Sequence, residues 1–94
     1  MINKNSFKLS IIIPCYNEHK TIDIIIKKIT DSLIMYNFLN YEIIIVDDFS
    51  TDGTRDKLNN FYSEKNIKIH LHDKNLGKGA AIQTAIKHVT GDLL

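Results

Sequence analysis

Two adjacent carboxylates, Asp47 and Asp48, follow directly on an apolar run and are the clearest chemical feature of this sequence. The run, residues 43–46, reads Ile-Ile-Ile-Val, and a short β-branched run bounded by polar residues is typical of a strand buried on both faces. In open α/β sheets, ligands bind at the carboxyl ends of the strands, so acids placed there are candidates for binding a ligand. The alternative is that both aspartates only cap a turn, because Asp is common in such turns.

A second loop, residues 14–18, offers an aromatic ring and a carboxylate at Tyr16 and Glu18. Tyr16 could stack on a nucleotide base, and Glu18 could accept a hydrogen bond. The alternative is a tyrosine packed on the edge of the sheet and a glutamate placed favourably near the N-terminus of a helix. This loop alone does not decide between the two interpretations.

A third loop, residues 73–79, reads Asp-Lys-Asn-Leu-Gly-Lys-Gly and leads into a predicted helix. Free N–H groups at a helix N-terminus bind phosphate, and Lys78 would add a positive charge. The spacing fits neither a P-loop nor the dinucleotide fingerprint, which would need a small residue at Ile82. Glycines that let the helix pack closely explain the same pattern.

The hydrophobic pattern predicts alternating strands and helices that would bring these three loops to one edge of a sheet. Each βαβ step takes about 30 residues, and such crossovers are right-handed and give parallel strands. The first strand should pair with the second, since both are fully apolar, and the alternating third strand should lie nearer an edge. We expect Pro14 to end the first strand and Gly91 to end the last helix. The predicted strands are 9–13, 41–47, 67–72 and the start of a fourth at 92–94, and the predicted helices are 19–36, 52–65 and 78–89.

Composition excludes several classes of protein. The chain has 94 residues with a net charge of +1, so charge gives no argument for binding nucleic acid. The single cysteine, Cys15, excludes an internal disulfide and fits a reducing compartment. No apolar run reaches the roughly 20 residues that span a bilayer, and residues 1–8 lack the apolar core of a secretory signal. We therefore expect a cytoplasmic protein. His70 and His72 would share a strand face without the further ligands that a metal site needs.

Three segments together resemble the opening of family 2 glycosyltransferases, most closely the polyprenyl-phosphate and dolichyl-phosphate sugar transferases. They are SIIIPCYNE at 10–18, YEIIIVDDFSTDGT at 41–54 and NLGKGAAIQTAIKHVTGDLL at 75–94, and their order and spacing match across nearly the whole chain from Leu9. The resemblance implies an α/β fold. It would be the partial, Rossmann-like nucleotide-binding half of a GT-A domain, with three parallel strands, the stub of a fourth and helices between them.

The resemblance also implies which residues hold a nucleotide-sugar donor. Asp48 would hydrogen bond to the base or ribose, whereas Asp47 would support its loop. Lys78 would help to neutralise the diphosphate. The full implied set of substrate-binding residues is Pro14, Tyr16, Glu18, Val46, Asp48 and Lys78. No catalytic residue is assigned within the chain.

One departure from the family pattern concerns metal binding. The metal-binding Asp-x-Asp motif normally follows a few residues after the Gly-Asp pair that is here Gly91-Asp92, and it does not occur in residues 1–94. We therefore expect residues 1–94 to be the N-terminal donor-binding part of a longer hexosyltransferase and to be inactive alone. A divalent metal, Mg²⁺ or Mn²⁺, would be held by ligands beyond this chain.

The expected partners follow from the same resemblance. They are a GDP- or UDP-sugar donor and an acceptor, polyprenyl phosphate or another, and not nucleic acid. The full-length protein could act at the cytoplasmic face of a membrane. Open sheet edges and apolar surface favour association, so a two-fold homodimer is also expected.

Two other classes of protein compete with this interpretation. A phosphoacceptor receiver module has acidic residues at strand ends, but its acidic pair would follow the first strand, whereas Asp47 and Asp48 follow the second. A non-catalytic nucleotide-binding or assembly module is the other alternative. Failure of a full-length protein to bind any nucleotide would favour it.

Overall fold

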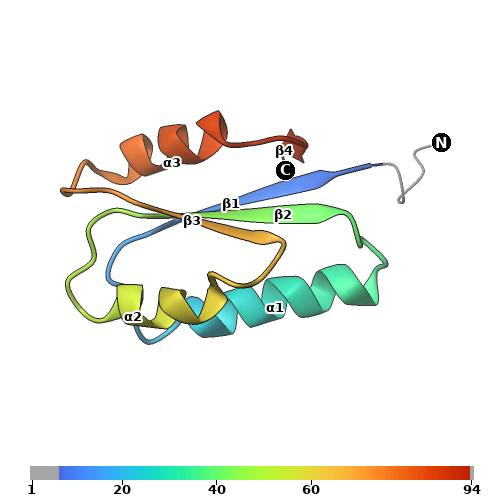
Figure 1. The fold of residues 1–94 in the computed structure, drawn as a ribbon, viewed down its shortest axis with the longest axis horizontal. Helices are drawn as coiled ribbons and strands as arrows, with labels where there is room; N and C mark the ends of the chain where they lie inside the picture. Colours follow the sequence, from blue (N-terminus) through green and yellow to red (C-terminus); the bar gives the residue numbers. More distant parts are fainter. Residues whose placement is uncertain (1–6, 94) are drawn as a thin grey trace.

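The computed structural model describes residues 7–93, which form a parallel sheet with helices on both faces. In Figure 1, α3 covers one face of the sheet, and α1 and α2 cover the other. This arrangement confirms the predicted α/β class. In chain order the elements are β1 (Leu9–Cys15), α1 (Ile22–Met35), β2 (Tyr41–Asp47), α2 (Thr54–Leu58), the 3-10 helix η1 (Asn59–Phe61), β3 (Ile67–Leu71), α3 (Lys78–Lys87) and β4 (Asp92–Leu93).

The strand order is β3-β2-β1-β4, and every pair of neighbours is parallel. β1 and β2 pair along seven residues, from Leu9 opposite Tyr41 to Cys15 opposite Asp47. The predicted pairing of the first two strands is therefore confirmed, as is the edge position of β3 among the described strands. The predicted start of a fourth strand is present as β4, and it lies beside β1, a position that was not predicted; Leu94 lies outside the described residues.

β2 is the most buried strand, because side chains cover both of its faces. Ile43 and Ile45 pack on the α1 and α2 side, and Ile44 and Val46 pack on the α3 side. All four side chains are fully buried. Burial on both faces explains why this strand is a continuous apolar run rather than an alternating one.

A buried carboxylate, Glu42, joins β2 to the segment that enters β4. It accepts hydrogen bonds from Ser10 Oγ at 2.6 Å, from the backbone N–H of Thr90 at 2.7 Å and from Lys68 Nζ at 3.2 Å. Burial alone would raise the pKa of Glu42, but the bonds from Ser10, Thr90 and Lys68 outweigh it and lower the pKa to about 2. The charged form is therefore the one that the fold stabilises.

Pro14 does not end the first strand, contrary to the sequence-based expectation, since β1 extends to Cys15 with Pro14 opposite Val46. Leu9 N donates to Asn40 O, and Cys15 O accepts from Asp48 N, so the odd-numbered residues of β1 bond toward β2. The nitrogen of Pro14 therefore faces the other side of β1. The missing N–H therefore removes no hydrogen bond from the ladder between β1 and β2.

Two helices begin or end differently from their predicted bounds. α1 starts at Ile22 instead of residue 19, because Thr21 N and Ile22 N both donate to Glu18 O in a preceding turn. α2 is only five residues long and continues as a 3-10 turn through Asn59 and Asn60. Asparagine is a poor helix former, so the expected helix to residue 65 is not sustained.

Gly91 also plays a different part from the one predicted. α3 ends at Lys87, with His88 as its C-cap, so Gly91 does not terminate the helix. A Cβ atom at Gly91 would stand 2.5 Å from the carbonyl oxygen of Lys8 and 2.9 Å from Ser10 Oγ. Glycine here permits the close approach of two backbone segments, which is a second common reason for that residue.

Candidate functional site

A cavity of about 350 Å³ lies at the carboxyl edge of the sheet, where the three loops singled out in the sequence meet. Such an edge is the usual ligand position in open parallel sheets. The cavity is lined by Pro14, Cys15, Tyr16, Glu18, Asp48, Asn75, Gly77, Lys78 and Ala81.

Five of the six predicted binding residues line this cavity, and Val46 does not. Val46 is fully buried and packs with Ala81 and Ala85 on the α3 side of the sheet. Val46 packs in one core cluster with Ala81, which does line the cavity. Asn75 and Gly77 were missed as individual residues, although the loop that contains them was singled out. Whether the five lining residues bind a ligand stays a prediction.

The first two loops are joined by reciprocal hydrogen bonds through Asn17. Its backbone N–H donates to Ser50 Oγ, and its side-chain oxygen accepts from the backbone N–H of Thr51, both at 2.8 Å. Asn17 has a φ of 51°, a left-handed conformation that asparagine tolerates better than most residues. These two hydrogen bonds hold the loop that carries Tyr16 and Glu18 against the end of β2.

Asp47 supports the loop that follows β2, as its position in the sequence suggested. Its side chain is fully buried and accepts hydrogen bonds from the backbone N–H of Ser50 at 2.9 Å and from Arg55 Nε at 2.6 Å. Burial opposes ionisation, but the bonds from Ser50 and Arg55 outweigh it and hold the pKa of Asp47 below its usual value. The neighbouring thiol of Cys15 responds oppositely, since burial and the charge of Asp47 raise its pKa to about 12.

Asp48 joins the end of β2 to the start of α3. Its carboxylate is almost fully buried and accepts backbone N–H bonds from Leu76 and Gly77, each at 2.8 Å, and a third bond from Nδ1 of His72 at 2.9 Å. Burial would raise the pKa of Asp48, but the bonds from Leu76, His72 and Gly77 lower it. Asp48 is therefore a carboxylate, with Oδ1 accepting two of the bonds and Oδ2 accepting one.

One acceptor position of Asp48 remains for a ligand. A carboxylate offers about four lone-pair sites, two on each oxygen. Both sites on Oδ1 are used by His72 and Leu76, whereas Oδ2 accepts only from Gly77 in the described contacts. A second donor at Oδ2 could come from a bound molecule in the cavity that Asp48 lines.

The two histidines near β3 have different partners, so they do not act as a pair. The ring of His70 stacks on His88 with 3.8 Å between the ring centroids. The ring of His72, just after the end of β3, lies between Asp48 and Thr84. The part played by His72 was not predicted. The signal was available in the sequence, because an acid after β2 and a histidine after β3 come from neighbouring strand ends.

The cavity combines three kinds of recognition group. The ring of Tyr16 is 45% exposed and can offer a stacking surface. Asp48 and Glu18 supply acceptors for N–H or O–H groups. Lys78 is the exposed first residue of the ten-residue α3, so a cation and free helix N–H groups occur together. An aromatic surface, acceptors and an anion-binding helix end suit the base, the sugar and the phosphates of a nucleotide.

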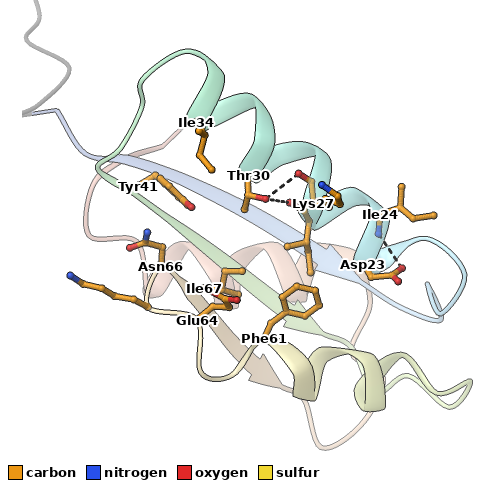
Figure 2. A pocket seen from close by; sticks show the side chains of 12 residues that line it. Asp23, Ile24, Lys27, Thr30, Ile34, Tyr41, Phe61, Glu64, Asn66 and Ile67 are labelled. Atoms are coloured by element: carbon orange, nitrogen blue, oxygen red, sulfur yellow. Dashed lines mark hydrogen bonds between the residues drawn. The ribbon is translucent and has the colours of Figure 1, made fainter.

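A larger cavity, of about 590 Å³, lies between α1 and the segment from η1 to the start of β3. Figure 2 shows Thr30 and Ile34 on α1 and, across the cavity from them, Tyr41, Phe61 and Ile67. Its walls are mainly aliphatic and aromatic, and Lys27 is paired with Asp31 at 2.8 Å. We place the candidate site in the smaller cavity, because that cavity lies at the carboxyl edge, where ligands bind in open parallel sheets.

Within residues 7–93, no three His, Cys, Asp or Glu side chains are grouped so as to hold a metal ion. Of the two carboxylates that line the cavity, Asp48 is already bonded to its own chain through His72, Leu76 and Gly77. In the same described part of the chain, no helix has the length and apolar character needed to cross a bilayer.

These features define a Rossmann-like α/β protein with a ligand-sized cavity at the carboxyl edge of a parallel sheet. The family model described as "Glycosyl transferase family 2" matches residues 10–94. The chain therefore belongs to glycosyltransferase family 2, and the resemblance seen in the three sequence segments is confirmed.

Curated relatives include several polyprenyl-phosphate sugar transferases. The chain is 35% identical to the dolichol-phosphate mannosyltransferase of Pyrococcus furiosus, over 92% of the chain and 24% of that protein. It is 36% identical to a dolichyl-phosphate beta-glucosyltransferase of Trichomonas vaginalis, over 95% of the chain and 29% of that protein. The chain thus spans only about a quarter of the length of these relatives.

Solved structures of glycosyltransferases share the fold. A mannosyltransferase from Pyrobaculum calidifontis, in complex with GDP-Man and Mn²⁺, superposes with a TM-score of 0.75 at 26% identity. The match covers 90% of this chain and 25% of that one. TarS of S. aureus matches with a TM-score of 0.73 at 30% identity, over 94% of this chain and 26% of that one.

Proposed function

We propose that this chain binds the nucleotide of a GDP- or UDP-sugar and so supplies donor recognition for transfer of a hexose. The observation that carries the proposal is the cavity that brings together Tyr16, Glu18, Asp48 and Lys78 from three separate loops. The related mannosyltransferase that was solved with GDP-Man supports the choice of a nucleotide-sugar.

Each group has a distinct part in the proposed complex. Tyr16 stacks on the base, and Asp48 accepts an N–H or O–H of the base or ribose at the open position on Oδ2. Glu18 accepts a ribose hydroxyl. Lys78 and the N–H groups that open α3 attract the diphosphate, because the positive end of the helix and the lysine charge both favour an anion.

A divalent metal is expected in the complete enzyme, where it would offset the negative charge that develops on the departing diphosphate. The related structure that contains GDP-Man also contains Mn²⁺. The described residues of this chain offer no grouped set of metal ligands. No step of transfer is therefore assigned to residues 7–93, whose proposed part is to bind and orient the donor.

The acceptor is proposed to be polyprenyl phosphate, since relatives that act on dolichyl or undecaprenyl phosphate cover most of this chain. With that acceptor, the complete enzyme would work at the cytoplasmic face of a membrane. The two-fold homodimer stays a prediction, and light scattering that showed a monomer at high concentration would contradict it.

The direct test is titration of the chain with GDP and with UDP, followed by amide NMR shifts. Shifts clustered at Tyr16, Glu18 and Asp48 would support the proposed site. Shifts only around residues 77–79, or sugar transfer by the 94-residue chain alone, would show that the site or its role has been misplaced. Failure of the full-length protein to bind any nucleotide would favour a non-catalytic assembly module.

A matched pair of tyrosine substitutions tests the stacking surface. Tyr16 and Tyr62 are 45% and 51% exposed, so neither substitution should unfold the chain. Tyr62 is not among the residues that line the cavity. Tyr16→Leu should weaken nucleotide binding about fivefold or more, the order expected for one base–aromatic stack. Tyr62→Leu should leave the affinity unchanged.

A further inference from the structure

Asp48, His72 and Thr84 form a hydrogen-bonded row, of which only Asp48 lines the proposed donor site. Nδ1 of His72 lies 2.9 Å from Oδ1 of Asp48, and Nε2 lies 2.8 Å from Oγ1 of Thr84. The side chains of Asp48 and His72 are 5% and 9% exposed. The row connects the end of β2, the end of β3 and the middle of α3.

The chemistry of the row fixes one hydrogen. An ionised carboxylate only accepts hydrogen bonds, so Nδ1 of His72 must carry the hydrogen that points at Asp48. The hydroxyl of Thr84 can donate or accept, so it satisfies Nε2 in either protonation state of the ring. In the bond to Asp48, His72 is therefore always the donor. The bond to Thr84 can run in either direction and holds the ring in place.

The backbone of His72 is held as firmly as its ring. Its N–H donates to the carbonyl oxygen of Asp47 at 2.9 Å, and its own carbonyl oxygen accepts from Arg55 at 2.6 Å. Because the backbone N–H, the backbone carbonyl and both ring nitrogens of His72 have hydrogen-bond partners, the ring is held in one position. It can therefore orient the carboxylate of Asp48. His72 and Leu76 together fill the acceptor sites of Oδ1, which leaves the open position on Oδ2.

We propose that His72 is a positioning residue of the donor site: it holds Asp48 so that the open acceptor of Oδ2 meets the bound nucleotide. Without the Nδ1–H bond, the carboxyl group of Asp48 could rotate and exchange its two oxygens between the nucleotide and the backbone of residues 76–77. This inference rests on the proposed function, because it assumes that a nucleotide occupies the cavity.

A plain structural cross-link is the competing explanation, and two substitutions separate it from positioning. The amide N–H of asparagine falls near the place of Nδ1, so His72→Asn can keep the bond to Asp48 and lose the one to Thr84. The amide of glutamine reaches nearer the place of Nε2, so His72→Gln does the reverse. The two variants therefore differ in the hydrogen bond that they keep, which is the bond to Asp48 in His72→Asn and the bond to Thr84 in His72→Gln.

The experiment measures GDP and UDP affinity of the wild-type chain and both variants by NMR titration, with a thermal melt of each. We expect His72→Asn to bind within about threefold of wild type. His72→Gln should bind about tenfold more weakly or worse, the order expected when a charged group loses a directing hydrogen bond. Both variants should lose similar thermal stability. Equal affinities of the two variants, or weaker binding by His72→Asn, would overturn the inference.

The two possible failures are distinguishable. A wild-type chain that binds neither nucleotide overturns the proposed function and, with it, the inference. A wild-type chain that binds, with variants of equal affinity, overturns the inference alone.

If neither variant folds, the ring nitrogens of the wild-type chain decide the question. Nucleotide should shift the ¹⁵N signals of His72 and leave those of His70, whose ring stacks on His88 instead, in place. An unchanged His72, or equal shifts of both rings, would overturn the inference.

Discussion

Arg55 donates from Nε to the buried carboxylate of Asp47 across 2.6 Å, and this contact ties the start of α2 to the end of β2. Asp47 is fully buried, whereas Arg55 is about one-third exposed. Removing the arginine would leave the buried carboxylate of Asp47 without the cation that pairs with it. The interaction is therefore expected to matter far more than other ion pairs of the same helix.

Arg55→Ala should lower the free energy of unfolding by roughly 1.5–3 kcal/mol, the range for a hydrogen bond to a charged group. Lys57→Ala is the control on the same helix, because Lys57 pairs with Asp23 at 3.5 Å between two partly exposed side chains. That pair should contribute under about 1 kcal/mol. Urea unfolding of both variants measures the difference, and equal losses would contradict the assignment.

Acid should destabilise the fold through its buried carboxylates. The pKa of Glu42 falls from 4.5 to about 2 on folding, and those of Asp47 and Asp48 also fall below 3.8. A lowered pKa stabilises the fold above the unfolded value, and the contribution is lost as pH falls through the folded value. The stabilisation that these three carboxylates contribute should thus be constant above about pH 5 and should decline as pH falls from about 4.5 toward 2.

The share of Glu42 can be measured separately. A shift from 4.5 to about 2 corresponds to about 3 kcal/mol at neutral pH. Glu42→Gln cannot ionise and should show a shallower decline in stability below pH 4.5, together with lower stability at pH 7. Unfolding curves across this pH range test the expectation. An unchanged slope for the variant would place the acid sensitivity elsewhere.

Asp48→Ala and Asp47→Ala should have separable effects. Loss of Asp48 should weaken nucleotide binding by about 1.5–3 kcal/mol, because it removes a charged acceptor from the cavity. Loss of Asp47 should act mainly on the stability of the loop that Ser50 and Arg55 hold. Titration with GDP and UDP under conditions where both variants remain folded measures the affinity. Equal weakening by the two variants would refute the division of roles.

Gly91→Ala should destabilise the chain, whereas Gly79→Ala should not. The new Cβ at Gly91 would stand 2.5 Å from a backbone oxygen that cannot move easily, but at Gly79 it would meet nothing within 4 Å. Gly79 lies in the first turn of α3, where alanine is the better helix former by up to about 1 kcal/mol. Thermal melts should therefore move in opposite directions, and a neutral Gly91→Ala would show that β4 can shift away from β1.

The positions of the strands could be predicted well from the sequence, because apolar, β-branched residue types indicate directly which positions are buried. The unbroken run at residues 43–46 identified β2 as a strand covered on both faces, and all four side chains are fully buried. Its position also predicted which acids would lie at the carboxyl edge. Local chemistry, that is periodicity and the nature of the side chains, was sufficient for these features.

Features that depend on distant segments were not predictable in the same way. Pro14 can lie within β1 because its nitrogen faces away from β2, and this depends on the register of the two strands. Gly91 is required by the backbone of Lys8, more than eighty residues earlier in the chain. His72 meets Asp48 only because of the register in which β2 pairs with β3. Val46 does not line the cavity because its side chain packs against α3.

The bonds of Asn17 to Ser50 and Thr51 span 33 and 34 residues, so the loop that carries Tyr16 and Glu18 is held at the cavity only while β1 and β2 remain paired. Opening of the two loops and fraying of that strand end are therefore parts of one cooperative event. A molecule bound in the cavity stabilises the closed form alone, and the native population rises with ligand concentration by mass action. Amide hydrogens in both loops should then exchange more slowly together, by a common factor, although they are far apart along the chain.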